Sequence, residues 1–342
     1  MSGELIRDLD EIVDAAADDL RRFTGARMYV TGGTGFVGGW LLRAIVHANR
    51  RLGTKIRVDA LTRSPEAAAD RAPDLAADPA IRFLRGDVLA PVVDGAYDAV
   101  VHAATPSSTP RDEALSEATM SVIVDGIRAV IRVVIEPSGA VPVLFTSSGA
   151  VYGRQPPDVQ LLPEDYAGAP DVLDPRSAYD EGKRFSELAL ALAQSRGAGK
   201  ARVARLFSFM GPGMHLDAHF AAGNFVRDAL AGGPIRIAGD GTPLRSYLYP
   251  TDLITWCLAI FARGLDARAY NVGSADEISI RELAETVARA AGGLKIEQRL
   301  APSRGNPERY VPDVRRITSE LGVSQSVSVV EAATRTLGSY AP

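Results

Sequence analysis

A glycine-rich turn between an apolar strand and a long helix constrains the fold of this chain more than any other feature. Arg27–Thr31 is predicted to form the strand and residues 36–50 the helix. The turn and the helix start contain Gly32, Gly35, Phe36, Val37 and Gly38. Glycines at this spacing allow a tight turn, close approach of the backbone to a pyrophosphate and close helix packing, while the first helical amides suit phosphates. The order of strand, turn and helix therefore predicts a dinucleotide-binding βαβ unit.

Further apolar strands alternate with helices as far as residue 208. We predict strands at Ile56–Thr62, Ile81–Arg85, Asp98–His102, Val141–Ser147 and Arg202–Phe207, and long helices near 112–136 and 177–195. Strands that are apolar on both faces and separated by helices indicate a parallel sheet covered on both sides. The predicted fold class is α/β, with a doubly wound parallel sheet of the Rossmann type.

Three regions are expected along the chain. Residues 1–24 form an amphipathic helix that packs on the following domain, because their apolar residues recur at helical spacing. Residues 25–207 form the dinucleotide-binding domain. Residues 208–342 form mainly a smaller α/β substrate lobe with helices near 219–231, 251–264 and 279–292, and some of its segments return to the core domain.

Composition excludes several classes of function. The net charge of −4 over 342 residues gives no nucleic-acid footprint. Cys257, the only cysteine, lies in an apolar run and is expected to be a buried structural thiol. No run of 18 apolar residues occurs, and the N-terminus lacks a basic segment followed by an apolar block, so we expect a cytoplasmic protein without a membrane span. No metal site is expected.

Tyr179 and Lys183 lie four residues apart in a predicted helix and therefore share one face. A nearby ammonium stabilises phenolate, so the lysine lowers the pKa of the tyrosine and makes it a proton-transfer group. The chain has few lysines but ten tyrosines. The Tyr-x-x-x-Lys spacing can therefore also arise by chance, and the surrounding motifs are needed to assign it a function.

Cofactor choice depends on the end of the second strand. NAD enzymes place an acid there to accept the ribose hydroxyls. Here Thr62 and Arg63 stand at the tip, and an arginine with flanking hydroxyls suits a 2′-phosphate. Strand alternation directs Asp59 away from this site. The tip therefore favours NADP over NAD.

The glycine turn together with the Tyr-x-x-x-Lys motif resembles the extended short-chain dehydrogenases/reductases, the NAD(P)-dependent family of nucleotide-sugar epimerases and dehydratases. The resemblance covers about residues 27 to 323. Further matching segments are Gly86–Val88, Val101–Ala104, Thr146–Gly153, Pro175–Tyr179 and Tyr270–Gly273. The resemblance implies hydride transfer between a nicotinamide and a sugar carbon, in particular C4.

The same resemblance assigns roles within the site. It implies that Tyr179 is the general acid/base, that Lys183 holds the nicotinamide ribose, and that Ser148 hydrogen-bonds the reacting sugar oxygen. A serine that ends a strand is otherwise commonly a turn or cap residue. The remaining implied cofactor contacts are Asp87 and Val88 at the adenine and Ala103 and Ala104 near the nicotinamide.

The substrate implied by the resemblance is a nucleotide-diphosphate sugar. Its implied contacts are Asn224, Arg245 and Arg309, and the two guanidinium groups suit a diphosphate. The alternative interpretation of these arginines is that they form surface ion pairs. His215 and His219, in the loop that precedes Asn224, are expected to be solvated or structural side chains. The family also implies a homodimer in which the helices near 112–136 and 177–195 form a four-helix bundle.

The chain departs from the family beside Ser148. Family dehydratases carry an Asp-Glu pair there and decarboxylases a glutamate, whereas this chain has Gly149 and Ala150. Their absence favours an epimerase or a 4-ketoreductase over a 4,6-dehydratase or a UDP-glucuronate decarboxylase-like enzyme. A non-catalytic dinucleotide-sensing protein is a further alternative, although both Tyr179 and Lys183 are present. Ile123 and Ser208 replace asparagines that are common in the family.

Overall fold

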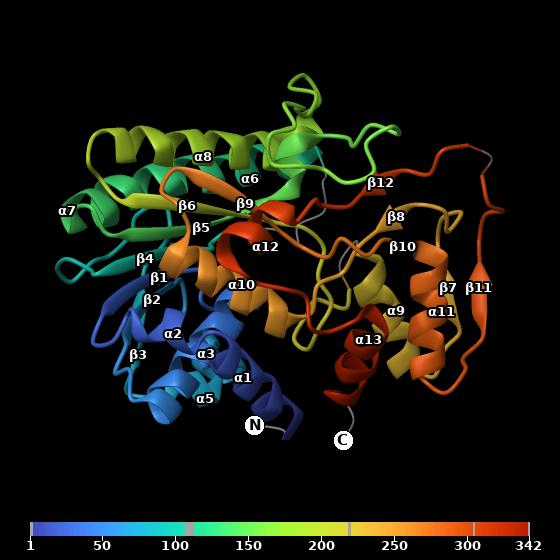
Figure 1. Ribbon diagram of the computed structural model, residues 1–342, viewed down its shortest axis with the longest axis horizontal. Coiled ribbons are helices and arrows are strands. Elements are labelled where there is room, and N and C mark those ends of the chain that lie inside the picture. Colours follow the sequence, from blue (N-terminus) through green and yellow to red (C-terminus); the bar gives the residue numbers. More distant parts are fainter. Residues whose placement is uncertain (1–2, 107–112, 218–219, 304, 341–342) are drawn as a thin grey trace.

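A seven-stranded parallel sheet forms the centre of the molecule (Figure 1). The computed structural model describes residues 3–106, 113–217, 220–303 and 305–340. The strand order is β3-β2-β1-β4-β5-β6-β9, so the chain starts near the middle and winds outwards in both directions. These strands are β1 (Arg27–Thr31), β2 (Arg57–Thr62), β3 (Ile81–Arg85), β4 (Ala99–His102), β5 (Pro142–Ser148), β6 (Lys200–Leu206) and β9 (Arg268–Val272). The predicted doubly wound α/β fold is confirmed.

Helices cover both faces of this sheet. One face carries α3 (Phe36–Leu52) and α10 (Pro250–Arg263), and the other carries α6 (Glu113–Val130) and α8 (Ala178–Ser195) (Figure 1). Shorter elements are α4 (Pro65–Arg71), α5 (Pro73–Ala76), α7 (Glu136–Ser138), α12 (Arg315–Leu321), a π-helical turn at Ile131–Ile135 and 3₁₀ turns at Gly149–Tyr152 and Pro175–Ser177. The strands β1, β4 and β5 are buried on both faces, as their near-continuous apolar sequences predict. Of the described helices, none combines the length and apolar character that crossing a bilayer requires.

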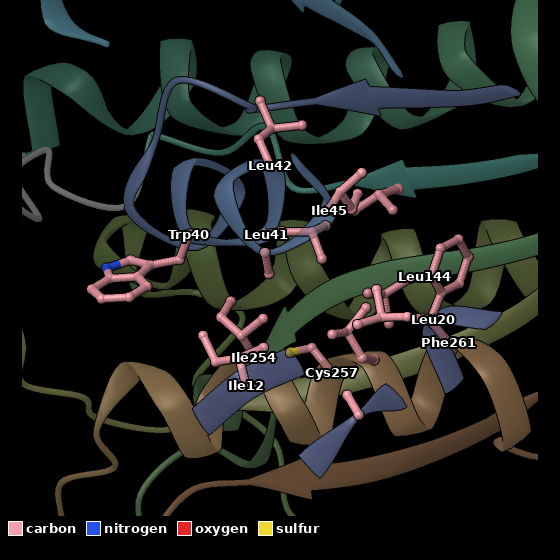
Figure 2. Close-up of a cluster of buried hydrophobic side chains, with 14 of the residues drawn as sticks. Ile12, Leu20, Trp40, Leu41, Leu42, Ile45, Leu144, Ile254, Cys257 and Phe261 are labelled. Atoms are coloured by element: carbon pink, nitrogen blue, oxygen red, sulfur yellow. The ribbon is translucent and has the colours of Figure 1, made fainter. Parts of the chain in front are cut away.

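The largest apolar cluster lies between the sheet, α3 and α10 (Figure 2). It contains Leu41 and Ile45 of α3, Ile254 and Cys257 of α10, and Leu144 of β5. Cys257 is buried, and burial raises the pKa of its thiol to about 12. The thiol therefore acts as a small apolar side chain in this cluster.

The first helices cover the outer side of this cluster. They are α1 (Gly3–Ala15) and α2 (Ala17–Arg21). Leu9, Ile12 and Val13 recur at helical spacing and are almost fully buried. Asp8 is also buried, where it accepts hydrogen bonds from the Tyr249 hydroxyl at 2.6 Å and from Arg335 at 3.0 Å. These contacts join the N-terminal helix to segments from the other end of the chain.

The C-terminal half contributes both to the sheet and to a separate cluster beside it. This separate apolar cluster contains residues of α9 (Ala221–Leu230), α11 (Ile280–Ala290) and α13 (Val329–Gly338). Two small sheets accompany these helices: β7 (Ile235–Ile237) with β11 (Ile296–Gln298), and β10 (Ile278–Ser279), β8 (Leu244–Arg245) and β12 (Arg309–Tyr310). The strand β9, which we had not predicted, returns from this half to pair with β6 in the main sheet.

Candidate active site

The glycine turn connects β1 to α3 in a conformation that depends on glycine. Gly32 has φ +72°, and a Cβ there would lie 2.5 Å from the Ala103 carbonyl group. A Cβ at Gly38 would lie 2.2 Å from the Gly32 oxygen. Gly35 precedes α3 in extended conformation and makes no side-chain cap. The amides of the first helical turn, including Phe36 and Val37, thus form an N-terminus that fits a phosphate group.

Asp59, the acid nearest the end of β2, belongs to a charged cluster away from the strand tip. Its carboxylate accepts hydrogen bonds from Arg27 at 2.6 Å, from Arg82 at 2.7 Å and 2.8 Å, and from the Tyr97 hydroxyl at 3.0 Å. Burial alone would raise the pKa of Asp59, but these hydrogen bonds and the Arg27 charge lower it below its usual range. The carboxylate is therefore ionised and engaged by three partners.

The tip of β2 carries basic side chains. Arg63 is exposed, and Arg85 lies at the end of the neighbouring strand, where it pairs in register with Thr62. Arg85 forms an ion pair with Glu66, which follows in the first turn of α4. The tip therefore combines two guanidinium groups with one exposed carboxylate.

The residues that follow β3 and β4 border the same edge of the sheet. Asp87 accepts a hydrogen bond from the amide of Leu89 at 2.9 Å, and Val88 packs against Gly126 of α6. The Ala103 backbone contacts Gly32, and the Ala104 amide donates to the Thr31 hydroxyl at 3.2 Å. The loops after β1 and β4 thus meet where the strand order reverses, which is the usual ligand crevice of such sheets.

His102, at the end of β4, is a structural residue. Its Nδ1 lies 2.9 Å from the Thr31 hydroxyl oxygen, and its ring is buried. Burial first, and then the charge of Lys183, lower the pKa of His102 to about 3. The ring is therefore neutral at physiological pH and orders the loop that carries Ala103 and Ala104.

Lys183 is buried beneath the tyrosine with which it shares a helix face. Its Nζ donates to the Thr105 hydroxyl at 2.7 Å and to the Thr146 carbonyl at 2.6 Å, and it lies 5.9 Å from the centroid of the Tyr179 ring. Burial lowers the pKa of Lys183 to about 7, against the opposing charge of Glu187. The ammonium is thus held next to the phenol by two fixed acceptors.

Tyr179 and Ser148 reach this edge from α8 and β5. Tyr179 lies in the first turn of α8 and is half-buried. Ser148 is the last residue of β5, and its hydroxyl oxygen accepts a hydrogen bond from the Ala150 amide at 3.2 Å. Because this bond uses the oxygen as acceptor, the hydroxyl hydrogen can still be donated to another group.

The position after Ser148 has no room for a side chain. A Cβ at Gly149 would lie 2.6 Å from Cζ of Phe207 and 2.6 Å from the Tyr310 hydroxyl oxygen. Phe207 directly follows β6, and Tyr310 is the last residue of β12, so both lie far along the chain from Gly149. The space in which family dehydratases carry an acid is thus filled by aromatic side chains.

A charged cluster that was not predicted from the sequence joins α8, β5 and β6. Glu187 lies one helical turn after Lys183 and accepts from the Ser147 hydroxyl at 2.6 Å. Arg205 of β6 donates to Glu187 through two nitrogens, at 3.0 Å and 2.7 Å, and to the Tyr152 hydroxyl at 2.9 Å. The i, i+4 spacing of Lys183 and Glu187 was the available signal in the sequence. Thr105 and Tyr310 had no local signal.

The two arginines predicted to bind a diphosphate lie on neighbouring strands. Arg245 pairs with Glu308 at 2.6 Å, and Arg309 pairs with Glu277 at 2.9 Å. In the register of β8 and β12, Arg245 lies opposite Tyr310 and Arg309 opposite Leu244. Paired residues share one face of a sheet. Arg245 therefore shares a face with Tyr310, and Arg309 belongs to the other.

Other predicted residues have structural partners or lie elsewhere. Asn224, in α9, accepts from Arg227 at 3.2 Å. Ile123 packs against Gly182 between the two catalytic candidates of α8, so an apolar helix contact replaces the family's asparagine. His215 is exposed, and His219 lies outside the described residues.

Comparison with known proteins agrees with this geometry. A sequence model described as the NAD dependent epimerase/dehydratase family matches residues 28–273. UDP-glucuronic acid decarboxylase 1 of Arabidopsis thaliana is 29% identical over 315 residues, which cover 92% of this chain and 69% of that protein. UDP-glucuronic acid decarboxylase 1 of Xenopus tropicalis is 30% identical over 194 residues, which cover 57% of this chain and 45% of that protein.

A solved structure gives a similar result for the fold. The chain superposes with a TM-score of 0.76 on a double mutant of dTDP-glucose 4,6-dehydratase from Streptomyces venezuelae with NAD bound. The two are 26% identical, and the match covers 92% of this chain and 96% of that one.

Proposed function

The chain belongs to the NAD-dependent epimerase/dehydratase family, and we propose that it transfers a hydride at a ring carbon, C4, of a nucleotide-activated sugar. One observation carries this proposal: the buried Lys183 ammonium lies beneath Tyr179 at the sheet edge that also bears the glycine turn and Ser148. Such a pair is suited to moving a hydroxyl proton beside a dinucleotide.

Each residue of the site has one proposed task. A nicotinamide cofactor, when bound, supplies the hydride acceptor or donor. Tyr179 removes or returns the proton of the sugar hydroxyl at the reacting carbon. In its protonated form Lys183 lies next to the phenol, favours phenolate and holds a ribose hydroxyl with its remaining N–H. Ser148 donates its hydroxyl hydrogen to the same sugar oxygen.

The residues beside Ser148 support an epimerase or a 4-ketoreductase. Elimination of water from a 4-keto sugar requires a base at C5 and an acid for the leaving hydroxyl. Gly149 and Ala150 supply neither, and Phe207 and Tyr310 occupy the space next to Gly149. If the cofactor is restored within each turnover, the enzyme is an epimerase; if NADPH is consumed, it is a reductase.

A second candidate is decarboxylation of a nucleotide-linked glucuronate, and the names of the relatives favour it. Oxidation at C4 would give a β-keto acid. Its C5–carboxylate bond breaks with release of CO₂, the electron pair enters the C4 ketone, and a proton then adds at C5. The ketone itself is the electron acceptor, so this step does not depend on a side-chain carboxylate at position 150, where this chain has Ala150.

We also propose that the cofactor is NADP in preference to NAD. Asp59 is engaged by Arg27, Arg82 and Tyr97, so it is not available to a ribose hydroxyl at the tip of β2. Arg63 stands exposed at that tip, where its guanidinium suits a 2′-phosphate. Dissociation constants of NADPH and NADH test this preference, and a tighter complex with NADH would contradict it.

A homodimer through α6 and α8 is proposed on the basis of exposed apolar residues. Leu188 and Leu192 of α8 are 58% and 51% exposed and lie on one helix face. Leucines at this spacing on an exposed helix suit a helix–helix interface. A second copy of the chain would cover them.

Product analysis tests the function and separates its versions. The protein is incubated with UDP- and dTDP-sugars, including UDP-glucuronate, and with 4-keto sugars, in the presence of NAD(P)⁺ or NAD(P)H. Isomer formation without net change in the nicotinamide indicates an epimerase, and stoichiometric NAD(P)H oxidation indicates a reductase. Release of CO₂ from UDP-glucuronate indicates a decarboxylase. Cofactor binding without conversion of any sugar nucleotide would contradict the proposal and support a sensing protein.

A further inference from the structure

Two aromatic residues from distant segments meet directly beside the candidate catalytic serine. Phe207 follows β6, and Tyr310 ends β12 in the C-terminal half. Their ring centroids lie 4.6 Å apart at an interplanar angle of 31°. Both side chains approach Gly149 so closely that a Cβ there would lie 2.6 Å from Cζ of Phe207 and 2.6 Å from the hydroxyl oxygen of Tyr310. Only glycine therefore fits between Ser148 and this aromatic pair.

The two residues differ in how they meet the site. Phe207 is almost fully buried and belongs to the apolar cluster around Val151, Tyr152 and Leu162. Tyr310 is only half-buried, and it is its hydroxyl oxygen that faces Gly149. A phenol has an apolar ring for packing and a polar end that bonds to other groups. Tyr310 thus packs against Phe207 and directs its hydroxyl towards Gly149, the residue next to Ser148.

The register of the small sheet relates Tyr310 to the phosphate side of the site. Tyr310 lies opposite Arg245 in the pairing of β12 with β8, so the two side chains leave the same face. Arg245 is the candidate diphosphate contact, and Ser148 is the candidate contact of the reacting sugar oxygen. Tyr310 therefore lies between a proposed diphosphate residue and the proposed reaction centre.

We propose that Tyr310 is a substrate-contact residue whose hydroxyl donates a hydrogen bond to an oxygen of the sugar ring next to the reacting carbon. This inference rests on the proposed function. Phe207 holds the Tyr310 ring in place, and the pair fills the volume that an acidic side chain at position 149 would need. Tyr310 thereby orients the sugar by a neutral hydrogen bond and sets a preference for sugars that carry an oxygen at that position.

The Tyr310→Phe variant tests the proposal because it removes the hydroxyl and keeps the ring. Loss of one neutral hydrogen bond to substrate lowers affinity by roughly 3- to 15-fold. We expect this change in KM of the converted sugar nucleotide, or in its dissociation constant measured by calorimetry on cofactor-loaded protein. The melting temperature and the dissociation constant of the cofactor should remain those of the wild type.

A matched control comes from the same aromatic cluster. The ring centroid of Tyr166 lies 6.3 Å from that of Tyr152, and Tyr166 is not among the residues nearest to a Cβ at Gly149. Tyr166→Phe also removes one phenolic hydroxyl, and we expect it to leave KM unchanged. A Tyr310→Phe variant with the KM and sugar-nucleotide affinity of the wild type would overturn the contact role and leave Tyr310 as packing alone.

The probes for binding are UDP-glucuronate and dTDP-glucose. Wild-type protein that neither binds nor converts any sugar nucleotide would overturn the proposed function and this assignment together. Wild-type protein that converts a sugar nucleotide, paired with an unaffected Tyr310→Phe variant, would overturn only this assignment.

Discussion

At the residue scale, Lys183 links the stability of the protein to its chemistry. Lys183 is 2% exposed, and its ammonium has two fixed acceptors, the Thr105 hydroxyl and the Thr146 carbonyl. Burial lowers the pKa of Lys183 from 10.5 to about 7. Between these values the unfolded chain holds the proton and the native protein does not, so the free energy of unfolding rises with pH in this window.

The first prediction compares the wild type with Lys183→Met across this window. From about pH 7 to about pH 10, the free energy of unfolding of the wild type should increase relative to that of the variant, because only the wild type has the native lysine to deprotonate. Below pH 7 the difference should be flat. Denaturant unfolding at a series of pH values measures it. Lys200→Met, at an exposed position, is the control. If the difference in free energy of unfolding between the wild type and Lys183→Met does not change between about pH 7 and about pH 10, the burial argument is contradicted.

How far the site could be predicted differs from residue to residue. Tyr179 and Lys183 were accessible because an i, i+4 pair depends only on local helix geometry. Tyr310 and Thr105 were not, because their positions depend on long-range pairing that brings separate segments to Gly149 and Lys183. Gly149 was noticed as an absent acid, but only the folded structure explains it as a contact with Phe207 and Tyr310.

At the element scale, three contacts fix α8 against the ends of β5 and β6. Lys183 bonds to the Thr146 carbonyl, and Glu187 bonds to the hydroxyl of the next residue, Ser147. Arg205 of β6 then pairs with Glu187. Because Ser148 is the last residue of β5, these contacts determine how Tyr179 and Ser148 lie relative to each other.

The second prediction concerns Glu187→Gln. Glutamine keeps the size but removes the charge that faces Arg205, so the free energy of unfolding should fall by about 1.5–3 kcal/mol. Turnover should fall more than substrate affinity, because misalignment of Tyr179 and Ser148 affects the reaction step. Chemical denaturation and steady-state kinetics measure the two effects. Glu181→Gln, at an ion pair with Arg184 in the same helix, is the control, and equal behaviour of both variants would contradict a positioning role.

Elements were predicted well where the pattern is local. The predicted helix near 36–50 is α3, and the first six strands are in the sheet within two residues of the predicted bounds. The seventh strand of the main sheet, β9, was not predicted, and its apolar pattern is interrupted by a polar residue, Asn271. Its strand structure depends on pairing with β6, which no local pattern reveals.

At the scale of the whole molecule, Asp8 joins the two ends of the chain. It accepts hydrogen bonds from Tyr249 at the start of α10 and from Arg335 of α13. Burial and the neighbouring Asp8 raise the pKa of Tyr249, so its phenol stays neutral and donates. The network holds α1 against the core and against the C-terminal helix.

The third prediction is that Asp8→Ala lowers the free energy of unfolding by about 3 kcal/mol. The variant leaves the Tyr249 hydroxyl without its acceptor and removes one of the carboxylates that neutralise the partly buried Arg335 guanidinium. Denaturant unfolding measures this loss. Asp18→Ala, at an exposed ion pair of α2, should change it by less than about 0.5 kcal/mol. Equal stability of Asp8→Ala and the wild type would show that α1 does not depend on this network.

The fourth prediction concerns the proposed dimer. Leu188→Glu combined with Leu192→Glu places two charges in the α8 interface, so the protein should become monomeric. Sedimentation velocity measures the mass of wild type and variant. Leu265→Glu, at an exposed leucine outside α6 and α8, is the control. A wild-type protein that is already monomeric at micromolar concentration would contradict the dimer.

Hydride transfer followed directly in wild-type and Tyr179→Phe protein tests the central claim of this account. Cofactor-loaded protein is mixed with a sugar nucleotide that the wild type converts, and the absorbance of reduced nicotinamide is recorded over a single turnover. The wild type should change the redox state of its nicotinamide, whereas Tyr179→Phe should do so at least about 100-fold more slowly and bind the cofactor equally well. A Tyr179→Phe variant that transfers hydride at the wild-type rate would contradict the claim.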